Sequence, residues 1–375
     1  MLSNYATASK ARVESEKSAA KESVKESVLM AEEQLRKSKS FASDADINGI
    51  CVRLITNSLH QHDFWTENWN KSSKARPDAV IYSVNGIGGQ KPSAKYCGEL
   101  DTAVFVNTEY YGQCKSWALG MASKIMEADG IHSIHAASAV YNGKGVIIVA
   151  PTGTGKTTQT SVIFMSEKGR LIGDDWVHID QRRKDLSAVQ PERKLYIRTE
   201  NAREQKWLIP ILQKSKCENV IEKRGECSHE KGDICGIEMG HGCCFWGFAN
   251  ARAIADRHVL SSGRVAEQAP LDLIVLLRRD NKSPAYEELD PDKAIEILRS
   301  GEYMIRPGAG PREMWGKMGK EPWYNPYLLV RDDRRQERFF RKEMERARCI
   351  IINTGAEGEI IERTHQRIVK ALEGE

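Results

Sequence analysis

Short apolar runs, each bounded by glycine, proline or charged residues, recur along most of the chain. Val146–Val149 and Leu273–Leu277 are uninterrupted apolar runs rich in branched side chains, a pattern typical of buried strands. Residues 81–89 and 102–106 combine β-forming side chains with turn residues and also predict strands. Residues 114–127 predict a helix that stops at an Asp-Gly pair. Together these elements predict an α/β fold.

Residues 1–40 carry a thin apolar stripe at helical spacing. The segment is rich in Ala, Glu, Lys and Ser and contains neither glycine nor proline. The stripe consists of Val13, Ala20, Val24, Ala31 and Leu35. One interpretation is an exposed helical arm that binds a second copy of the chain or another partner. The other is an arm that frays on its own.

The patterns divide the chain into three regions. Residues 1–40 form the helical arm, 41–130 a smaller N-terminal lobe and 131–375 the core. Two segments of the core stand out: an insert at about 215–245 that contains Cys and His, and a loop at 301–330 rich in aromatic residues, Gly and Pro.

Composition excludes several classes of protein. Hydrophobic residues make up 40% and charged residues 29% of the chain, which is typical of a globular protein. The net charge of +4 is too small to favour a nucleic-acid partner. The sequence contains neither an apolar run long enough to span a bilayer nor an apolar signal core, so a cytoplasmic protein without membrane contact is expected.

A phosphate-binding pattern directly follows the Val146–Val149 run. The residues Ala150-Pro-Thr-Gly-Thr-Gly-Lys156-Thr157 match Walker A, except that Ala150 occupies the place of the first glycine. In such a loop the backbone N–H groups point at phosphate oxygens, and the next helix adds its positive end. Lys156 is expected to reach the β- and γ-phosphates and Thr157 to bind Mg²⁺. The predicted nucleotide-binding residues of the loop are Thr152, Gly153, Thr154, Gly155, Lys156, Thr157 and Thr158.

Two aspartates and one histidine flank this loop in the sequence. Asp174 and Asp175 follow the apolar step Leu171–Gly173, where they could hold a metal ion or accept the proton of an attacking hydroxyl. His135 precedes the loop, at a position where ordinary Walker ATPases have no characteristic histidine. All three are therefore candidate catalytic residues, together with Lys156.

Three segments around these residues resemble the superfamily that contains phosphoenolpyruvate carboxykinase and HPr kinase/phosphorylase. The segments are IHAASAVYNG from Ile134, APTGTGKTT from Ala150 and LIGDDWVHI from Leu171. ATP-dependent carboxykinases carry a comparable His segment, phosphate loop and Asp-Asp step in the same order. The spacing from His135 through Gly143-x-Gly145 to Lys156 is similar to that of HPr kinases.

Two outer segments are also similar to carboxykinase elements. Glu109–Ser116 resembles a Tyr- and Lys-containing element before the His, and Ile350–Gly355 resembles the segment beside the adenine. The resemblance implies a phosphate-loop core with a mixed sheet, ATP as the phosphoryl donor, and Mg²⁺ or Mn²⁺. The residue roles that it implies are Thr157, Asp175 and His135 as metal ligands, Lys115 against the transferring phosphoryl group, and Arg363 beside the nucleotide.

Two departures from the carboxykinase pattern shape the predicted reaction. Ser116 stands where carboxykinases have a second, metal-binding Lys, and no segment resembles their oxaloacetate-binding Arg motif. We therefore expect an ATP-dependent kinase that phosphorylates a hydroxyl of a small molecule or a protein Ser. One aspartate of the pair would sit near the metal and the other would accept the proton, in an order that the sequence leaves open. The alternatives are a carboxykinase-like lyase and a catalytically silent nucleotide-binding regulator.

Candidate substrate-binding residues lie further along the chain. Arg278 and Arg279 end the Leu273–Leu277 strand, where ligands of open α/β sheets gather. They either neutralise phosphate charge or simply close the strand. In the 301–330 loop, a substrate-binding lid would use Arg306, Arg312, Trp315, Tyr324 and Asn325. The alternative is a loop packed on the core.

The nine cysteines include a compact group with histidines. This group contains Cys227, His229, Cys235, His241, Cys243 and Cys244. It lacks the Cys-x₂-Cys spacing of common zinc sites, so plain packing is preferred over structural zinc or a redox role.

Overall fold

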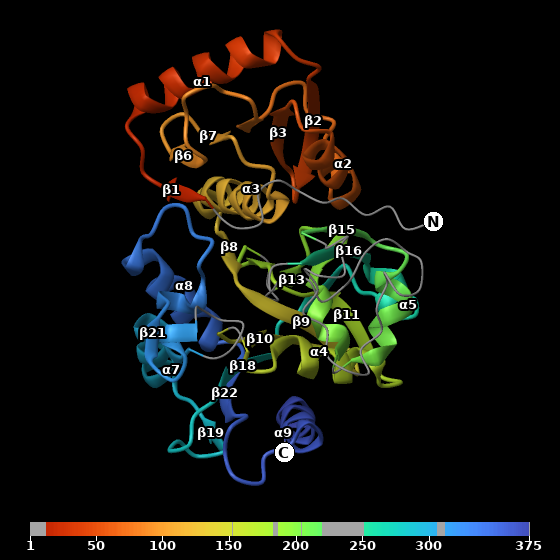
Figure 1. Cartoon of the computed structure of the whole chain (residues 1–375). Helices are drawn as coiled ribbons and strands as arrows, with labels where there is room; N and C mark the ends of the chain where they lie inside the picture. Colours follow the sequence, from red (N-terminus) through yellow and green to blue (C-terminus); the bar gives the residue numbers. More distant parts are fainter. Residues whose placement is uncertain are drawn as a thin grey trace. The chain divides into compact units, whose positions relative to one another are not determined.

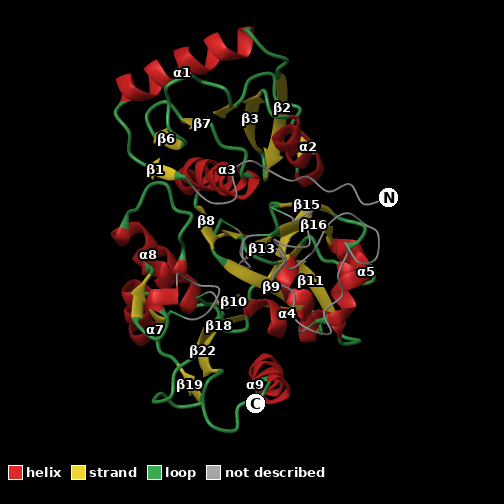
Figure 2. Ribbon diagram, viewed as in Figure 1, coloured by secondary structure: helices red, strands yellow, loops and turns green. Residues whose placement is uncertain are grey.

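The computed structural model describes residues 13–151, 153–182, 187–203, 205–219, 251–305 and 312–374. Within these ranges the chain forms helices and several sheets, which confirms the predicted α/β class (Figure 2). The chain divides into two compact units, each built from two separate segments (Figure 1). Unit 1 comprises Met1–Ile125 and Glu192–Leu260, and unit 2 comprises Met126–Pro191 and Ser261–Glu375. Residues 192–260, which the sequence patterns assign to the core region, thus belong by their contacts to unit 1.

A seven-stranded mixed sheet forms the centre of unit 1, in the order β1-β6-β7-β5-β3-β2-β4. The strands are β1 (Glu14–Glu16), β2 (Phe41–Ile47), β3 (Ile50–Thr56), β4 (Asn70–Lys71), β5 (Ala79–Val84), β6 (Ser93–Cys97) and β7 (Thr102–Val106). The central strands β3, β5 and β7 are parallel. Strand β2 runs antiparallel to β3 and β4, and β6 runs antiparallel to β7 but parallel to β1. Strands β5 and β7 confirm the two strands predicted in this region.

The N-terminal apolar stripe is covered within unit 1. Helix α1 (Lys21–Arg36) places Val24 and Ala31 in one buried cluster with Val84 and Val104 of the sheet. Burying these side chains supplies the stabilisation that an isolated 16-residue helix lacks in water. Val24 and Ala31 of the stripe that suggests a partner-binding arm therefore pack against the sheet of the same chain.

Helix α3 (Tyr111–Met126) confirms the helix predicted over 114–127. A 3-10 turn, Glu127–Asp129, extends it and ends at Gly130, whose φ of 76° lies in the left-handed region that glycine adopts without strain. Helix α2 (Leu59–Asn68) begins at Ser58, whose side chain accepts a hydrogen bond from the Gln61 N–H. Helices α2 and α3 carry the contacts to the second segment of unit 1.

That second segment forms a small antiparallel sheet in the order β14-β16-β15. Its elements are β14 (Lys194–Arg198), α5 (Ile209–Leu212), β15 (Lys216–Glu218), β16 (Arg252–Asp256) and α6 (Arg257–Leu260). The Glu218 carboxylate, fully buried, accepts hydrogen bonds from the backbone N–H groups of Tyr111 and Gly112 at the start of α3. A carboxylate at a helix N-terminus accepts hydrogen bonds from the unpaired N–H groups, and its negative charge is attracted to the positive end of the helix dipole. Glu218 therefore links the second segment of unit 1 to α3 in the first segment.

Unit 2 contains a six-stranded mixed sheet in the order β11-β9-β10-β18-β22-β19. The strands are β9 (Ala136–Tyr141), β10 (Lys144–Val149), β11 (Gly169–Gly173), β18 (Leu273–Arg278), β19 (Tyr286–Glu288) and β22 (Arg348–Asn353). Strands β10, β18 and β22 are parallel neighbours. A second, antiparallel sheet contains β8 (Ile131–Ile134), β12 (Val177–Asp180), β13 (Ser187–Val189) and β17 (Gln268–Pro270). A hairpin of β20 (Glu302–Met304) and β21 (Met318–Lys320) completes the unit.

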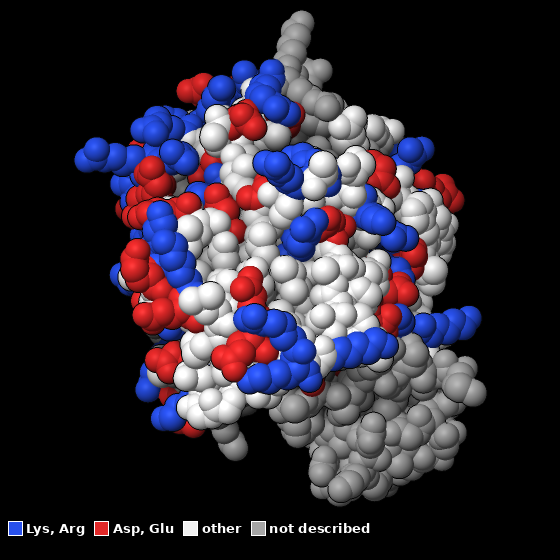
Figure 3. Space-filling view, turned by 90° about the horizontal axis from the view of Figure 1, so that it is seen from above, with Lys and Arg blue, Asp and Glu red and all other residues white. Residues whose placement is uncertain are grey.

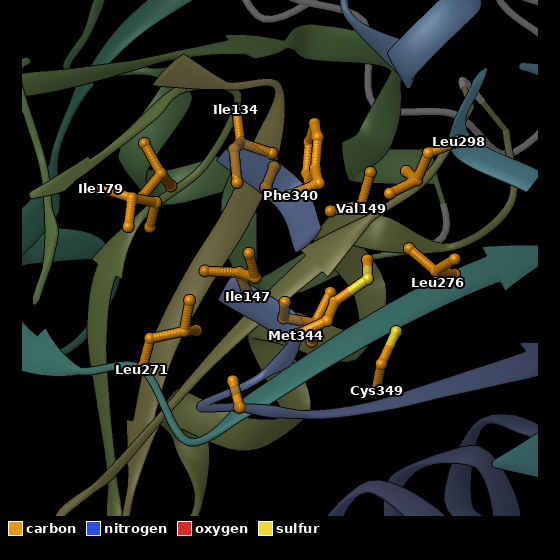
Figure 4. Close-up of a cluster of buried hydrophobic side chains, with 14 of the residues drawn as sticks. Ile134, Ile147, Val149, Ile179, Leu271, Leu276, Leu298, Phe340, Met344 and Cys349 are labelled. Atoms are coloured by element: carbon orange, nitrogen blue, oxygen red, sulfur yellow. The ribbon is translucent and has the colours of Figure 1, made fainter. Parts of the chain in front are cut away.

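Both faces of the main sheet are covered, which explains the uninterrupted apolar runs of β10 and β18. The covering helices are α4 (Lys156–Met165), α7 (Pro291–Ser300), α8 (Asp333–Met344) and α9 (Ile361–Glu373). On one face, Ile148 lies in a cluster with Ile163 of α4 and Ile368 of α9. On the other, Ile147 and Val149 share a cluster with residues of α7 and α8 (Figure 4).

The buried Glu343 of α8 makes the stability of unit 2 depend on pH. Burial raises the pKa of this fully buried carboxyl to about 7 from 4.5, although the Gln181 amide donates a hydrogen bond to it. Below pH 4.5, the pKa of this carboxyl in the unfolded chain, the carboxyl is neutral in both the folded and the unfolded state. Between pH 4.5 and 7 the carboxyl ionises in the unfolded state but stays protonated in the folded protein, so the folded state loses up to about 3 kcal/mol of stability over this range.

We therefore expect Glu343→Gln to raise the free energy of unfolding at pH 8, with little change at pH 4.5. Denaturant unfolding monitored at both pH values measures the difference. Glu345→Gln, at the exposed C-cap position directly after α8, serves as the control. Equal effects of Glu343→Gln at both pH values would contradict the raised pKa.

The described surface is mixed in charge. On the face drawn in Figure 3, Lys and Arg side chains are interspersed with Asp and Glu side chains, in keeping with the mild net charge of +4. In the part of the chain that the structure describes, every helix is too short or too polar to cross a membrane.

Candidate functional site

The candidate site of unit 2 lies where two strands pass from one sheet to the other. Strand β8 gives way to β9 at His135, and β11 gives way to β12 across Asp174–Trp176. Ile134 pairs with Val177 in the antiparallel sheet, and Ser138 pairs with Gly173 in the main sheet. These two interruptions, at His135 and at Asp174–Trp176, are called the sheet breaks below and lie opposite each other. His135 and Asp175 meet there, with 3.1 Å between Nε2 and Oδ1.

The backbone at the acidic pair has an unusual conformation. Asp175 has a φ of 86°, in the left-handed region that residues with a side chain rarely adopt. A Cβ at Gly173 would lie 1.7 Å from Gln190 Oε1, so a larger residue there would require the Gln190 side chain to move. Strained residues held in place by their surroundings are concentrated at functional sites, and the carboxylate of this strained residue contacts His135.

The predicted phosphate loop connects β10 to α4. Gly153 and Gly155 have φ of 84° and 102°, which only glycine adopts easily. The Thr154 hydroxyl donates to the Pro151 carbonyl at 2.7 Å, and the Thr354 hydroxyl donates to the Thr154 carbonyl at 2.9 Å. The N-cap residue Gly155 has no side chain to cap α4, and the first N–H groups of a helix are groups that can bind an anion. Thr152 lies outside the described residues.

Two side chains of this loop reach the sheet breaks. The Lys156 ammonium lies 2.9 Å from His135 Nε2. One residue later, the Thr157 hydroxyl donates to Asp174 Oδ2 at 2.8 Å. The structure therefore brings His135, Lys156, Thr157 and both aspartates together within one unit.

The second oxygen of the Asp174 carboxylate, Oδ1, is buried and has no hydrogen-bond partner among the described residues. Such an atom is costly unless something binds it. With the Thr157 hydroxyl beside it, Asp174 suits a hard cation such as Mg²⁺, which takes few protein oxygens and completes its shell with phosphate and water. The described residues contain no group of three or more His, Cys, Asp or Glu that would hold a metal alone.

His135 is fixed from the opposite side by a loop. Its Nδ1 lies 2.9 Å from the Tyr324 carbonyl oxygen, which can only accept, so Nδ1 carries the proton. Tyr327 of the same loop donates its hydroxyl to Asp175 Oδ1 at 3.4 Å. Tyr327 is not one of the predicted lid residues, and its signal in the sequence is the concentration of aromatic residues in the 301–330 loop.

Lys115 is placed in unit 1, on α3. Its ammonium lies 3.0 Å from Glu192 Oε1, and both side chains are only 1% exposed. The adjacent Ser116 hydroxyl donates to the Gly112 carbonyl in the preceding turn of the helix, at 2.7 Å. The structure thus assigns Lys115 a buried ion pair, and its contact with a phosphoryl group stays a prediction.

The predicted arginines differ in their surroundings. Arg278 ends β18, with Nε buried and 3.9 Å from Asp280 Oδ2. Arg279 donates to the Gly153 carbonyl at 3.4 Å and so contacts the phosphate loop directly. Arg363 lies exposed in the first turn of α9. Arg306 and the side chain of Arg312 lie outside the described residues.

The side chains of Tyr324 and Asn325 are engaged within their own loop region. The Tyr324 hydroxyl donates to the Glu302 carbonyl at 2.9 Å, and Asn325 Oδ1 accepts from the Tyr327 N–H at 3.2 Å. Both residues are buried. Of the two interpretations of this loop, these contacts fit a segment packed on the core. The Cys/His group at 227–244 lies outside the described residues.

Fold and site together define an α/β protein in which a glycine-rich strand–loop–helix turn meets a His and an acidic pair at the end of a mixed sheet. No protein-family model matches the chain, and no curated protein matches it either.

Proposed function

We propose that the chain is an ATP-dependent kinase with a phosphate-loop core of the carboxykinase/HPr-kinase type, which transfers the γ-phosphoryl group to a hydroxyl of a small molecule. One observation carries the proposal. Lys156 and Thr157 of the loop each contact a polar residue at the sheet breaks, His135 at 2.9 Å and Asp174 at 2.8 Å. A phosphate held by the loop would therefore lie beside groups able to bind a cation and accept a proton.

The loop would hold the donor. The N–H groups at the start of α4 would bind phosphate oxygens, and Lys156 would offset the charge of the β- and γ-phosphates. Arg279, which already contacts the Gly153 carbonyl, is placed to add a second positive charge at the loop. Charge neutralisation and positioning supply most of the catalysis in phosphoryl transfer.

The Thr157–Asp174 contact supports a division of work between the aspartates. Asp174, with its unpaired buried oxygen, would hold Mg²⁺ together with Thr157, a role that the resemblance gives to Asp175. When bound, the ion would neutralise phosphate charge. Asp175 and His135 would then face the acceptor hydroxyl.

In the proposed transfer the acceptor hydroxyl oxygen bonds to the γ-phosphorus as the bond from that phosphorus to the β,γ-bridging oxygen breaks. The hydroxyl proton passes to the His135–Asp175 pair, and ADP leaves with the bridging oxygen. A hydroxyl acceptor needs only a base within hydrogen-bond reach and an in-line γ-phosphoryl group. A dicarboxylate acceptor would need further cations, and Ser116, in the place of a metal-binding Lys, does not supply one.

Release of ADP in the presence of candidate acceptors tests the proposal. We expect a compound among sugars, polyols and hydroxyl amino acids to stimulate ADP release, and oxaloacetate to have no effect. Omitting Mg²⁺ and Mn²⁺ provides the control. Manganese-dependent formation of CO₂ and phosphoenolpyruvate from oxaloacetate and ATP would decide for the lyase instead.

A further inference from the structure

The segment Pro322–Tyr327, here called the strap, has a conformation that its sequence does not favour. Two consecutive residues with side chains, Trp323 and Tyr324, have φ of 60° and 46°, both in the left-handed region. Such residues persist only where the surroundings hold them.

Buried contacts anchor the strap in unit 2. The indole of Trp323 is buried, stacks on Phe340 with ring centroids 5.5 Å apart, and donates from Nε1 to Asp333 Oδ1 at 3.0 Å. The Tyr324 hydroxyl donates to the Glu302 carbonyl. These contacts fix the backbone between them, including the Tyr324 carbonyl.

The anchored carbonyl sets the tautomer of His135. It accepts the Nδ1–H at 2.9 Å, so a neutral imidazole has its lone pair at Nε2. Nε2 is the nitrogen beside Lys156 and Asp175, at 2.9 Å and 3.1 Å. With the opposite tautomer, Nε2 could not accept a proton.

Tyr327 acts on both members of the pair. Its hydroxyl donates to Asp175 Oδ1 at 3.4 Å, and its ring meets the His135 ring edge-on, with centroids 5.1 Å apart. The fully buried Trp176 also packs against the Tyr327 ring, with 5.1 Å between the ring centroids. Tyr327 thus restricts the movement of the imidazole and orients the carboxylate.

We infer that the strap is a positioning device for the His135–Asp175 pair, with the Tyr324 carbonyl selecting the His135 tautomer and the Tyr327 hydroxyl orienting Asp175. The kinetic part of this inference rests on the proposed kinase function, whereas the tautomer can be measured in the protein without any substrate. Residues that hold a catalytic group in this way act through it, and their loss typically lowers activity 10–100-fold.

Nitrogen-15 NMR of the full chain labelled at histidine provides the first test. The His135 signals are assigned by their loss in His135→Asn. We expect the shift of a protonated nitrogen at Nδ1 in the ligand-free protein, and a change at Nε2 in Tyr327→Phe. An Nε2–H tautomer in the wild type would overturn the inference whether or not the protein is a kinase.

Steady-state kinetics provides the second test once an acceptor is known. Tyr327→Phe removes one hydroxyl and keeps the ring, so we expect kcat to fall roughly tenfold while the KM for ATP stays unchanged. Tyr303→Phe, in the neighbouring β20 strand, is the matched control and should leave both constants at wild-type values. Wild-type kcat and an unshifted Nε2 signal in Tyr327→Phe would show that the hydroxyl positions nothing. If the strap inference holds but the kinase proposal fails, the NMR result stands without any turnover.

Discussion

Replacing Lys156 with alanine is expected to lower phosphoryl transfer by about 10²–10³-fold while the fold survives. The side chain supplies the cation that offsets γ-phosphate charge, and one preorganised donor of this kind typically contributes that factor. Its polar contact in the described structure is His135, at the site itself, so its removal leaves the packing of α4 unchanged. In the purified variant, ADP release measures turnover, nucleotide titration measures nucleotide binding, and circular dichroism measures the fold.

Lys168→Ala is the matched control for this experiment, because Lys168 is exposed just beyond the C-terminal end of α4. It removes the same charge from the same part of the chain, away from the loop. Wild-type turnover in a folded Lys156→Ala protein would refute the phosphate-loop assignment.

The second large effect is expected at the acidic pair, where asparagine at one position should lower kcat and asparagine at the other should weaken Mg²⁺ binding. Asp175→Asn should lower kcat by ~10²-fold or more with nucleotide affinity retained, the usual scale for loss of a general base. Asparagine tolerates the left-handed φ of 86° at this position, so the backbone should keep its shape. Asp174→Asn should instead raise the Mg²⁺ concentration needed for half-maximal turnover, because it removes the charge beside Thr157.

Titrations of turnover against Mg²⁺ and against ATP separate the two effects. If the metal dependence moved with Asp175→Asn and not with Asp174→Asn, the assigned roles would be exchanged. Normal turnover in both variants would rule out the mechanism altogether.

A strand of unit 2 and a helix of unit 1 could each be predicted because local pattern and burial agree there. The apolar run Val146–Val149 is uninterrupted, and the sheet of unit 2 is covered on both faces at that strand. The helix predicted over 114–127 ends as expected, because Gly130 can adopt the left-handed conformation at no cost. In both cases the local structure is determined by a few residues that are neighbours in the sequence.

The assembly of the site depended on contacts that local pattern cannot reveal. His135 meets Asp175 because two strands change sheets at the same level, and only the resemblance to known families suggested that they belong together. Tyr327 reaches Asp175 across 152 positions of sequence, from a loop in which Pro and Gly leave no periodic pattern to read. Residues 192–260 likewise contact the first segment of unit 1 through residues far apart in the sequence, such as Lys115 and Glu192.

The contact of Glu218 with the start of α3 also has a consequence for synthesis of the protein. The carboxylate that receives the Gly112 N–H comes 106 positions later in the chain. At the usual 5–20 residues per second, a ribosome needs roughly 5–20 s to supply it. For that time the nascent helix emerges with its first N–H groups uncapped, and the first segment of unit 1 lacks part of its core. Translation speed across residues 113–218 should therefore influence the yield of native protein more than speed over the last 100 or so residues.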